Sequence, residues 1–318
     1  TPSVIISNSS GVVYITNEGN FQFGNAAISL YDKDSKNIIE DYYKQVNQVP
    51  LGDVCQSMVY FNNKFYIVVN NSSKVMVVNA ATFKIETTIS GFNSPRYFIP
   101  VSNSKAYVSD LYDNRLAIVN LSTNIISGYI PAVAGTEQMK MVYGKVFVSS
   151  LFTDKIYVIN SMTDLLTDSI ALAYSPNSIC EDKNGMLWIM CSGDSLKQKP
   201  SALVQLNPID NQVIKSLYFN GNHAPWRMCM NKQNDTLYFL DRHVWQMSIG
   251  DTTLPTTPFI NGNGKLFYAL NVDASNGEIY VSDAIDYLQH GSIYRYTASG
   301  DLTDQFKAGI IPGGFCFR

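Results

Sequence analysis

Tyr107-Val108-Ser109-Asp110 is one of seven copies of a short motif that recurs along this 318-residue chain and indicates its fold. Each copy has an aromatic residue followed by three residues that are mostly β-branched or small, and the copies lie 40 to 52 residues apart. They begin at Tyr14, Tyr66, Tyr107, Phe147, Trp188, Tyr238 and Tyr280. A period of this length with strand-like content is typical of solenoids and propellers.

The repeat is clearest in residues 95–130, where four apolar runs are separated by turns. The runs are 96–100, 106–110, 116–120 and 125–130, and the residues between them are mainly Asn, Asp and Ser. Short β-rich runs with this punctuation indicate antiparallel strands. Four such strands per repeat define a propeller blade. We therefore predict an all-β fold, a seven-bladed β-propeller of four-stranded antiparallel blades, with 1–318 forming a single domain.

The two ends of the chain predict how the ring closes. The first blade has strand-like runs at 12–16, 27–31 and 38–43 but has no innermost strand before them. Residues 312–318 match the first-strand pattern that starts at Pro95 and Pro225. We expect 312–318 to pair with 12–16, which removes an open sheet edge that would favour aggregation.

Composition excludes some partners and some chemistry. The net charge is -3 and there is no run of Lys or Arg, so a nucleic-acid partner is not expected. No stretch of eighteen apolar residues occurs, so no transmembrane segment is predicted. Cys180, Cys229 and Cys316 each lie four residues after a proline, where the third blade has Ile99, which indicates buried core thiols rather than disulfides.

Length variation between the repeats predicts the binding face. In a propeller, the turns between second and third strands and the links between blades share one face, here called the top. The longer pieces, 17–25, 44–54, 192–201 and 284–291, all belong to such turns or links. Insertions confined to one face usually mark the binding face of a repeat protein.

Candidate ligand-binding residues follow from this assignment. Aromatic side chains in the top loops and polar side chains at the mouths of the inner strands suit a large, partly flat ligand with a polar rim. The predicted residues are Gln56, Arg96, Tyr112, Gln138, Phe152, Asn177, Trp226, Arg227 and Tyr287. No catalytic residue, metal ligand or cofactor is predicted.

Two other functions compete with ligand capture. Trp, Tyr and Arg also lead protein-protein interfaces, so an adhesive or surface-layer scaffold fits the same residues. A metal-dependent hydrolase or lactonase would need several carboxylates converging on the channel. The inner-strand mouths supply one acid, Glu137, and the three histidines, His223, His243 and His290, have no ligand spacing. The metal enzyme is therefore the less favoured alternative.

The motifs that begin at Tyr14, Tyr107 and Tyr280 resemble the YVTN repeat of surface-layer-type β-propellers. The resemblance covers essentially the whole chain. The chain is also similar to exported propeller lipoproteins of gut Bacteroidetes. These include a surface propeller that captures cobalamin for an outer-membrane transporter. The resemblance implies a location at the outer face of the outer membrane, a lipid anchor through a segment absent from this chain, and a corrinoid ligand or a transporter as partner.

Overall fold

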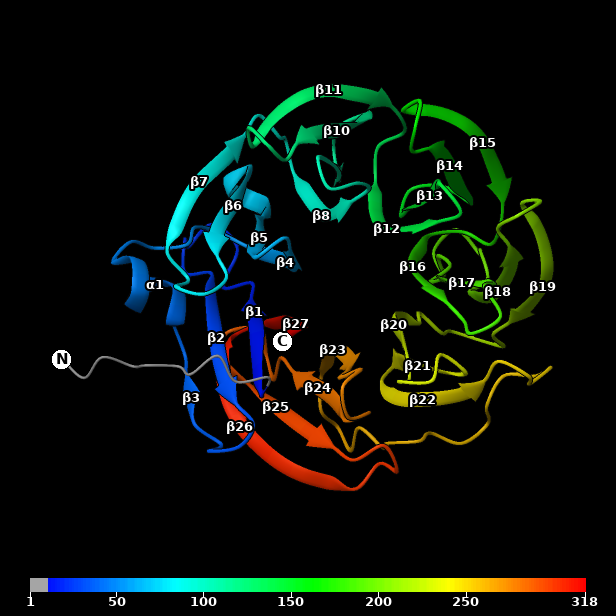
Figure 1. The fold of residues 1–318 in the computed structure, drawn as a ribbon. Helices are drawn as coiled ribbons and strands as arrows, with labels where there is room; N and C mark the ends of the chain where they lie inside the picture. Colours follow the sequence, from blue (N-terminus) through cyan, green and yellow to red (C-terminus); the bar gives the residue numbers. More distant parts are fainter. Residues whose placement is uncertain (1–10) are drawn as a thin grey trace.

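Seven antiparallel sheets surround a central axis in the computed structural model, which describes residues 11–318 (Figure 1). The predicted seven-bladed β-propeller is confirmed. Blade one is β27-β1-β2-β3, and blades two to seven follow in chain order from β4 to β26. Within the described residues no helix is long and apolar enough to cross a membrane.

The elements alternate with short turns along the chain. The strands are β1 (Val12–Asn17), β2 (Ala27–Asp32), β3 (Ile38–Ile39), β4 (Cys55–Phe61), β5 (Lys64–Val69), β6 (Lys74–Asn79), β7 (Ile85–Ser90), β8 (Pro95–Pro100), β9 (Lys105–Asp110), β10 (Arg115–Asn120), β11 (Ile125–Pro131), β12 (Thr136–Val142), β13 (Lys145–Ser150), β14 (Lys155–Asn160), β15 (Leu165–Ala171), β16 (Pro176–Glu181), β17 (Leu187–Cys191), β18 (Ala202–Asn207), β19 (Gln212–Tyr218), β20 (Trp226–Met230), β21 (Thr236–Asp241), β22 (His243–Ser248), β23 (Phe267–Val272), β24 (Ile279–Asp283), β25 (His290–Tyr296), β26 (Leu302–Ile310) and β27 (Pro312–Phe317). The helices are α1 (Tyr42–Asn47) and the 3-10 turn η1 (Asn70–Ser72).

The core consists of the second and third strands of each blade, which are packed between neighbouring sheets. β5 is buried from Phe65 to Val69, and β14 from Ile156 to Ile159. The asparagine that ends several third strands starts the next turn: Asn120 Oδ1 accepts hydrogen bonds from the backbone N–H groups of Ser122 (2.9 Å) and Thr123 (3.2 Å). This Asx turn explains why asparagine recurs there.

The ring closes through β27 and β1, as the sequence predicts. Ile15 pairs with Phe315 and Tyr14 with Cys316. Blades one and seven are also joined by a buried ion pair of 2.6 Å between Lys33 Nζ and Asp273 Oδ2. Closure therefore uses both a backbone ladder and side-chain contacts.

One predicted strand is wrong in part. The expected fourth strand at 38–43 is reduced to β3, and the chain then forms α1. Asp41 caps this helix by accepting a hydrogen bond from Lys44 N (3.2 Å), and Tyr43 is buried beside Phe83. Burial of the Tyr43 ring and the side-chain cap stabilise a helix where the apolar run alone indicates a strand.

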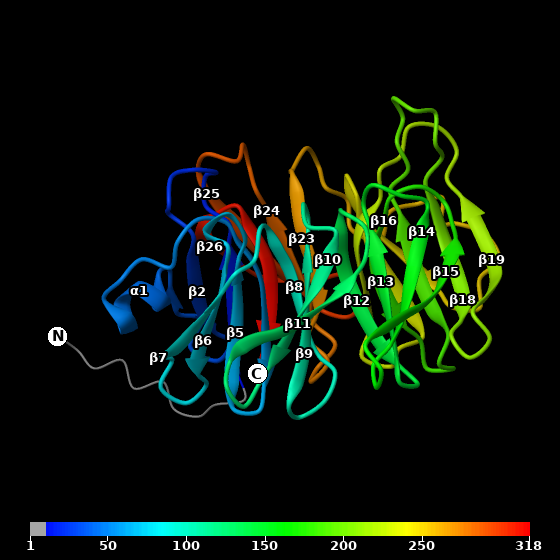
Figure 2. The ribbon, with the colours of Figure 1, turned by 90° about the horizontal axis from the view of Figure 1, so that it is seen from above.

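The expectation that all four long pieces lie on the top face is also wrong in part. Figure 2 shows 17–25, 192–201 and 284–291 projecting from one face, whereas α1 lies on the outer flank. Asn47, at the end of α1, binds Phe83 O (3.0 Å) and Ile85 N (2.9 Å) near the turn between β6 and β7, which belongs to the opposite face. Only the later part of 44–54 returns to the top, where Gly52 bridges Ala26.

Blade six departs from the repeat. Its sheet contains three strands, β20 to β22, within the described part of the chain. The segment 249–266 follows β22 and touches it through an isolated bridge between Val244 and Ile260. The outer side of this blade is therefore built differently from that of the other six.

Candidate functional site

The inner strands carry one repeated irregularity at their top ends. A β-bulge interrupts the pairing at the start of all seven inner strands: β4, β8, β12, β16, β20, β23 and β27. Bulges re-aim side chains and are common beside functional sites. Here they place one residue of each blade at the same level of the channel. This set, the mouth ring, comprises Gln56, Arg96, Glu137, Asn177, Trp226, Tyr268 and, in blade one, Gly313.

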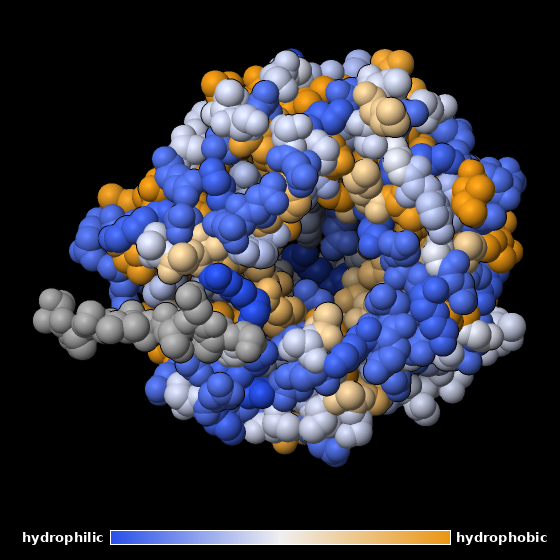
Figure 3. All heavy atoms as spheres, in the orientation of Figure 1, coloured by the Kyte–Doolittle hydropathy of each residue, from blue (hydrophilic) through white to orange (hydrophobic). Residues whose placement is uncertain are grey.

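The mouth ring surrounds a cavity of about 240 Å³, here called the mouth cavity. Six ring side chains line it, together with the residues that follow four of them and with loop residues of the top face. Figure 3 views the propeller along the same axis from the opposite face and shows that this face is also hollowed at its centre, with hydrophilic atoms inside. The remaining lining residues are Glu18, Val54, Tyr97, Gln138, Leu151, Ser178, Ser192 and Arg227.

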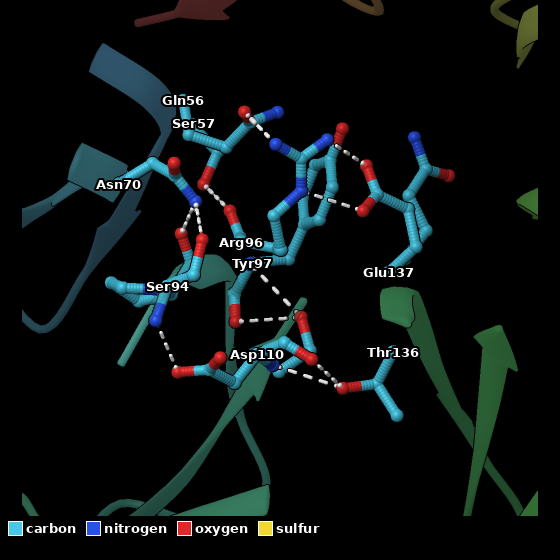
Figure 4. A network of polar contacts seen from close by, with 12 residues as sticks. Gln56, Ser57, Asn70, Ser94, Arg96, Tyr97, Asp110, Thr136 and Glu137 are labelled. Atoms are coloured by element: carbon cyan, nitrogen blue, oxygen red, sulfur yellow. Dashed lines mark hydrogen bonds and ion pairs between the residues drawn. The ribbon is translucent and has the colours of Figure 1, made fainter. Parts of the chain in front are cut away.

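Arg96 connects three neighbouring blades (Figure 4). Its Nε and Nη2 each donate to a carboxylate oxygen of Glu137 at 2.7 Å, and Nη1 donates to Gln56 Oε1 at 2.5 Å. Burial alone lowers the pKa of Arg96, but the charge and hydrogen bonds of Glu137 raise it overall. The guanidinium therefore stays charged, and its planar fork holds Glu137 in one orientation.

A second polar network holds the strands beneath Arg96. Asn70 Nδ2 donates to Ser94 Oγ (2.8 Å) and Pro95 O (3.0 Å), and Ser94 N donates to Asp110 Oδ2 (2.8 Å). Asp110 N in turn donates to Thr136 Oγ1 (2.9 Å), which links blade three to blade four. Figure 4 shows this chain of contacts beside the Arg96 cluster. The mouth ring is thus supported by satisfied, buried hydrogen bonds, which rigidify the site.

Glu18 takes the place that blade one leaves empty in the mouth ring. A Cβ on Gly313 would lie 2.7 Å from Glu18 Oε1, so the glycine makes room for the carboxylate. The hydroxyl of Tyr268 donates to Glu18 at 3.0 and 3.1 Å. Burial raises the pKa of Glu18, although Arg227 and Tyr268 act in the opposite direction. The mouth cavity therefore has two acids, not the single Glu137 that the sequence indicates.

Arg227 retains unused hydrogen-bonding capacity. Its Nη1 donates to the Tyr97 hydroxyl (2.6 Å), and Nη2 lies 4.0 Å from Glu18 Oε1. The guanidinium also lies 5.2 Å from the Trp226 ring centroid. Within residues 11–318, Arg227 Nε has no hydrogen-bond partner, and neither does Gln56 Nε2. Buried donors without partners are costly, so an oxygen-bearing ligand group would find two of them here.

Six of the nine predicted site residues meet in the mouth cavity: Gln56, Arg96, Gln138, Asn177, Trp226 and Arg227. Tyr112, Phe152 and Tyr287 do not line it. They lie on the top face with 64%, 49% and 43% of their surface exposed. Tyr287 reaches the site indirectly, because its ring packs edge-on against Tyr268 at 5.7 Å.

Sequence reasoning missed Glu18, Tyr97 and Tyr268. Tyr268 could have been found by alignment of the repeats, because Phe267-Tyr268 occupies the place of Pro95-Arg96 at the bulge. Tyr97 follows Arg96 directly. Glu18 carries no such signal, since it belongs to a loop and reaches the channel only because residue 313 is glycine.

Metal and thiol chemistry have no evident centre in this part of the chain. Among residues 11–318, no group of three or more His, Cys, Asp or Glu side chains could hold a metal ion. All five cysteines are free, and burial raises the pKa of Cys180 and of Cys316 to about 12. Four of these thiols are buried, whereas Cys180 is partly exposed and its Sγ donates to Met228 O at 3.4 Å.

A family model described as a domain of unknown function, DUF5074, matches residues 11–308. The chain belongs to the DUF5074 family. No curated protein matches its sequence significantly.

Several solved structures share the DUF5074 chain's fold. A quinonprotein alcohol dehydrogenase-like protein from Bacteroides thetaiotaomicron has a TM-score of 0.76 and 15% identity, covering 97% of this chain and 78% of its own. A functionally unknown protein from Desulfotomaculum acetoxidans has a TM-score of 0.75 and 12% identity, covering 96% and 98%. The extracellular domain of a putative one component system from B. thetaiotaomicron has a TM-score of 0.68 and 14% identity, covering 96% and 44%. Identities this low establish the fold alone.

Proposed function

We propose that this protein is a non-catalytic, cell-surface propeller that binds a ligand on its top face. The observation that carries the proposal is the convergence of six predicted residues on one rigid cavity that retains unpaired donors. Binding would be favoured because the ring holds these side chains in place before the ligand arrives, which lowers the ordering cost of association.

The ligand would use the mouth cavity and the rim differently. The cavity, at about 240 Å³, lies below the size of sites that enclose a whole drug-sized molecule. It suits one polar group, for which Arg227 Nε and Gln56 Nε2 are donors and Glu137 and Asn177 are neighbouring partners. The bulk of the ligand would lie above it, against exposed aromatic side chains such as Tyr287.

The most specific form of this proposal is a corrinoid, cobalamin or a relative, passed on to an outer-membrane transporter. Its support is the resemblance to surface propellers together with the chemistry of the top face. A corrin macrocycle is broad and apolar on its faces and carries amide side chains at its edge. One amide would enter the mouth cavity while the ring covers aromatic side chains at the rim. A surface location is compatible with the extracellular domain among the structural neighbours.

Calorimetric titration with cyanocobalamin tests the corrinoid form. We expect saturable heat from the unaltered protein and at least about a tenfold loss of affinity for Trp226→Ala and for Arg227→Ala. Tyr143→Ala and Arg115→Ala are matched controls, because Tyr143 is exposed on the opposite face and Arg115 stacks on Tyr129 at the outer edge. Absence of heat at high micromolar ligand rejects the corrinoid, and equal losses in the control variants reject the mouth cavity as its site.

A protein-binding scaffold is the second candidate, and a particular feature of the top face favours it. Phe23 and Leu288 are 76% and 71% exposed, and their loops are joined by a 2.7 Å hydrogen bond from Asn20 Nδ2 to Tyr287 O. Exposed apolar side chains on linked loops suit a protein partner. Under this alternative Phe23→Ser would abolish partner binding, whereas Arg227→Ala would leave it unchanged.

A further inference from the structure

A second cavity, of about 470 Å³, lies on the outer flank between blades five and six. We call it the flank cavity. Its walls are the end of β19, the link 219–223, the upper parts of β21 and β22, and residues 252–256. A volume of this size is in the usual range for small-molecule sites. It shares no lining residue with the mouth cavity.

The irregular outer side of blade six creates this space. In the other blades a fourth strand pairs with the third and fills the flank. In blade six the segment 249–266 instead runs outward after β22 (Figure 1) and returns to it at the Val244–Ile260 bridge. A gap therefore remains between this segment, β22 and the neighbouring β19, and side chains from all three line it.

The polar groups of the flank cavity are available to a ligand. His223 Nδ1 bonds to Asp241 Oδ2, which fixes the imidazole and leaves Nε2 without a partner among residues 11–318. The hydroxyls of Ser216, Thr252 and Thr253 make no hydrogen bond to any described residue. These hydroxyls and the imidazole supply hydrogen-bond donors and acceptors around one side of the space.

The apolar part of the flank cavity consists of aromatic and aliphatic side chains. Phe219 packs edge-on against Phe239, with ring centroids 5.8 Å apart. The indole of Trp245 is held by a 3.0 Å hydrogen bond from its Nε1 to Asp241 O. Leu254 and Pro255 complete the apolar wall. No lysine or arginine lines the flank cavity, whereas the carboxylate of Asp241 does.

We infer that the flank cavity binds an uncharged sugar ring. A pyranose presents apolar C–H groups on its faces, which pack on aromatic rings, and hydroxyls around its edge, which need donors and acceptors. The flank cavity offers both in one place. A purely apolar ligand would leave the hydroxyls and His223 Nε2 without partners, and an anion would face the Asp241 carboxylate.

Titration with glucose, galactose, mannose and N-acetylglucosamine tests this inference. Each is taken to about 50 mM, so that even a site with a Kd of about 1 mM would be nearly saturated. The Trp226→Phe variant is used for fluorescence, since it leaves Trp245 as the accessible indole while Trp188 is fully buried. We expect a saturable fluorescence change with at least one of the four sugars.

Substitutions then assign the binding to the flank cavity. Trp245→Ala, which removes the fluorescent reporter and is therefore followed by calorimetry, is expected to abolish it. The nearly isosteric Asp241→Asn and the exposed Thr253→Val are each expected to weaken it several-fold without unfolding the protein. Arg227→Ala, in the mouth cavity, should change nothing. The inference is overturned if binding of none of the four sugars saturates, or if sugar affinity is unchanged in both Asp241→Asn and Thr253→Val. Tetramethylammonium serves as a cationic probe of the aromatic side chains. Tighter binding of this cation than of every sugar would also overturn the inference.

Discussion

The mouth cavity and the flank cavity differ in how their polar groups are used. In the mouth, Arg96, Glu137 and Gln56 bond mainly to one another, and the seven blades contribute equivalent positions. In the flank, His223 and Asp241 form one pair and the hydroxyls around them have no described partner. The mouth follows from the repeat, whereas the flank follows from a blade that departs from it.

Contributions to stability and to ligand binding are therefore distributed unequally between the mouth cavity and the flank cavity. The charges of the mouth are buried, so removal of one leaves another without compensation. The threonine side chains of the flank, Thr252 and Thr253, are exposed, so they can be changed at little cost to the fold. Substitutions in the two cavities should therefore have very different effects on unfolding, and these effects can be measured.

The largest effect is expected from Arg96→Met. The side chains of Arg96 and Glu137 are 17% and 7% exposed, so the variant leaves a buried carboxylate without its partner. We expect a loss of about 3 kcal/mol in the free energy of unfolding by urea. The double variant Arg96→Met with Glu137→Met should recover most of it. No recovery would show that packing, rather than charge compensation, holds the mouth together.

A smaller effect is expected from Gly313→Ala. The added Cβ would meet Glu18 Oε1 at 2.7 Å and Cγ at 3.1 Å, so the Glu18 side chain must move. We expect a destabilisation of about 1–2 kcal/mol. In a Glu18→Ala background the same change should be nearly neutral. A cost that persists there would locate the crowding in the backbone and not in Glu18.

The charge of Glu18 makes the free energy of unfolding depend on pH. Burial raises its pKa above the ordinary value of 4.5, so the fold favours the protonated carboxyl. The stability linked to this group is complete below the unfolded-state pKa and is lost as pH rises through the folded-state pKa. Glu18→Gln should therefore be more stable than the unaltered protein near pH 7, with the difference shrinking near pH 4. A difference independent of pH would contradict this account.

The smallest effect is expected in the flank. Thr253→Val changes an exposed side chain without a described partner, and we expect its free energy of unfolding by urea to stay within about 0.5 kcal/mol of that of the unaltered protein. A loss comparable to that of Arg96→Met would show that the Thr253 side chain makes contacts that stabilise blade six.

Much of the fold could be predicted from the sequence because each repeat encodes its strands in the same way. The aromatic motifs identified the second strands, and the Asn, Asp and Ser residues between the apolar runs marked the turns. The β27–β1 closure followed from one match between residues 312–318 and other first strands. α1 could not be predicted in this way, because its stability depends on burial of Tyr43 against Phe83 from the next blade.

The site residues that occupy an equivalent position in several blades could be predicted, whereas those that occur at a single place in the fold could not. Gln56, Arg96, Asn177 and Trp226 occupy one position of the blade, so their convergence follows from the ring. Glu18 reaches the channel because Gly313 has no side chain, which only the closed structure shows. His223 and Asp241 meet across the blade-to-blade link of a three-stranded blade, and no spacing in the sequence indicates that contact.

The pairing of β27 with β1 also has a consequence for biosynthesis. About 300 residues separate the two strands, so β1 leaves the ribosome long before its partner exists. At ordinary translation rates this delay is roughly 15–60 s. During that interval Ile15 and its neighbours present an unoccupied template to other nascent chains. Chaperone protection of the first blade would matter more for this protein than for one whose blades each complete themselves as they emerge.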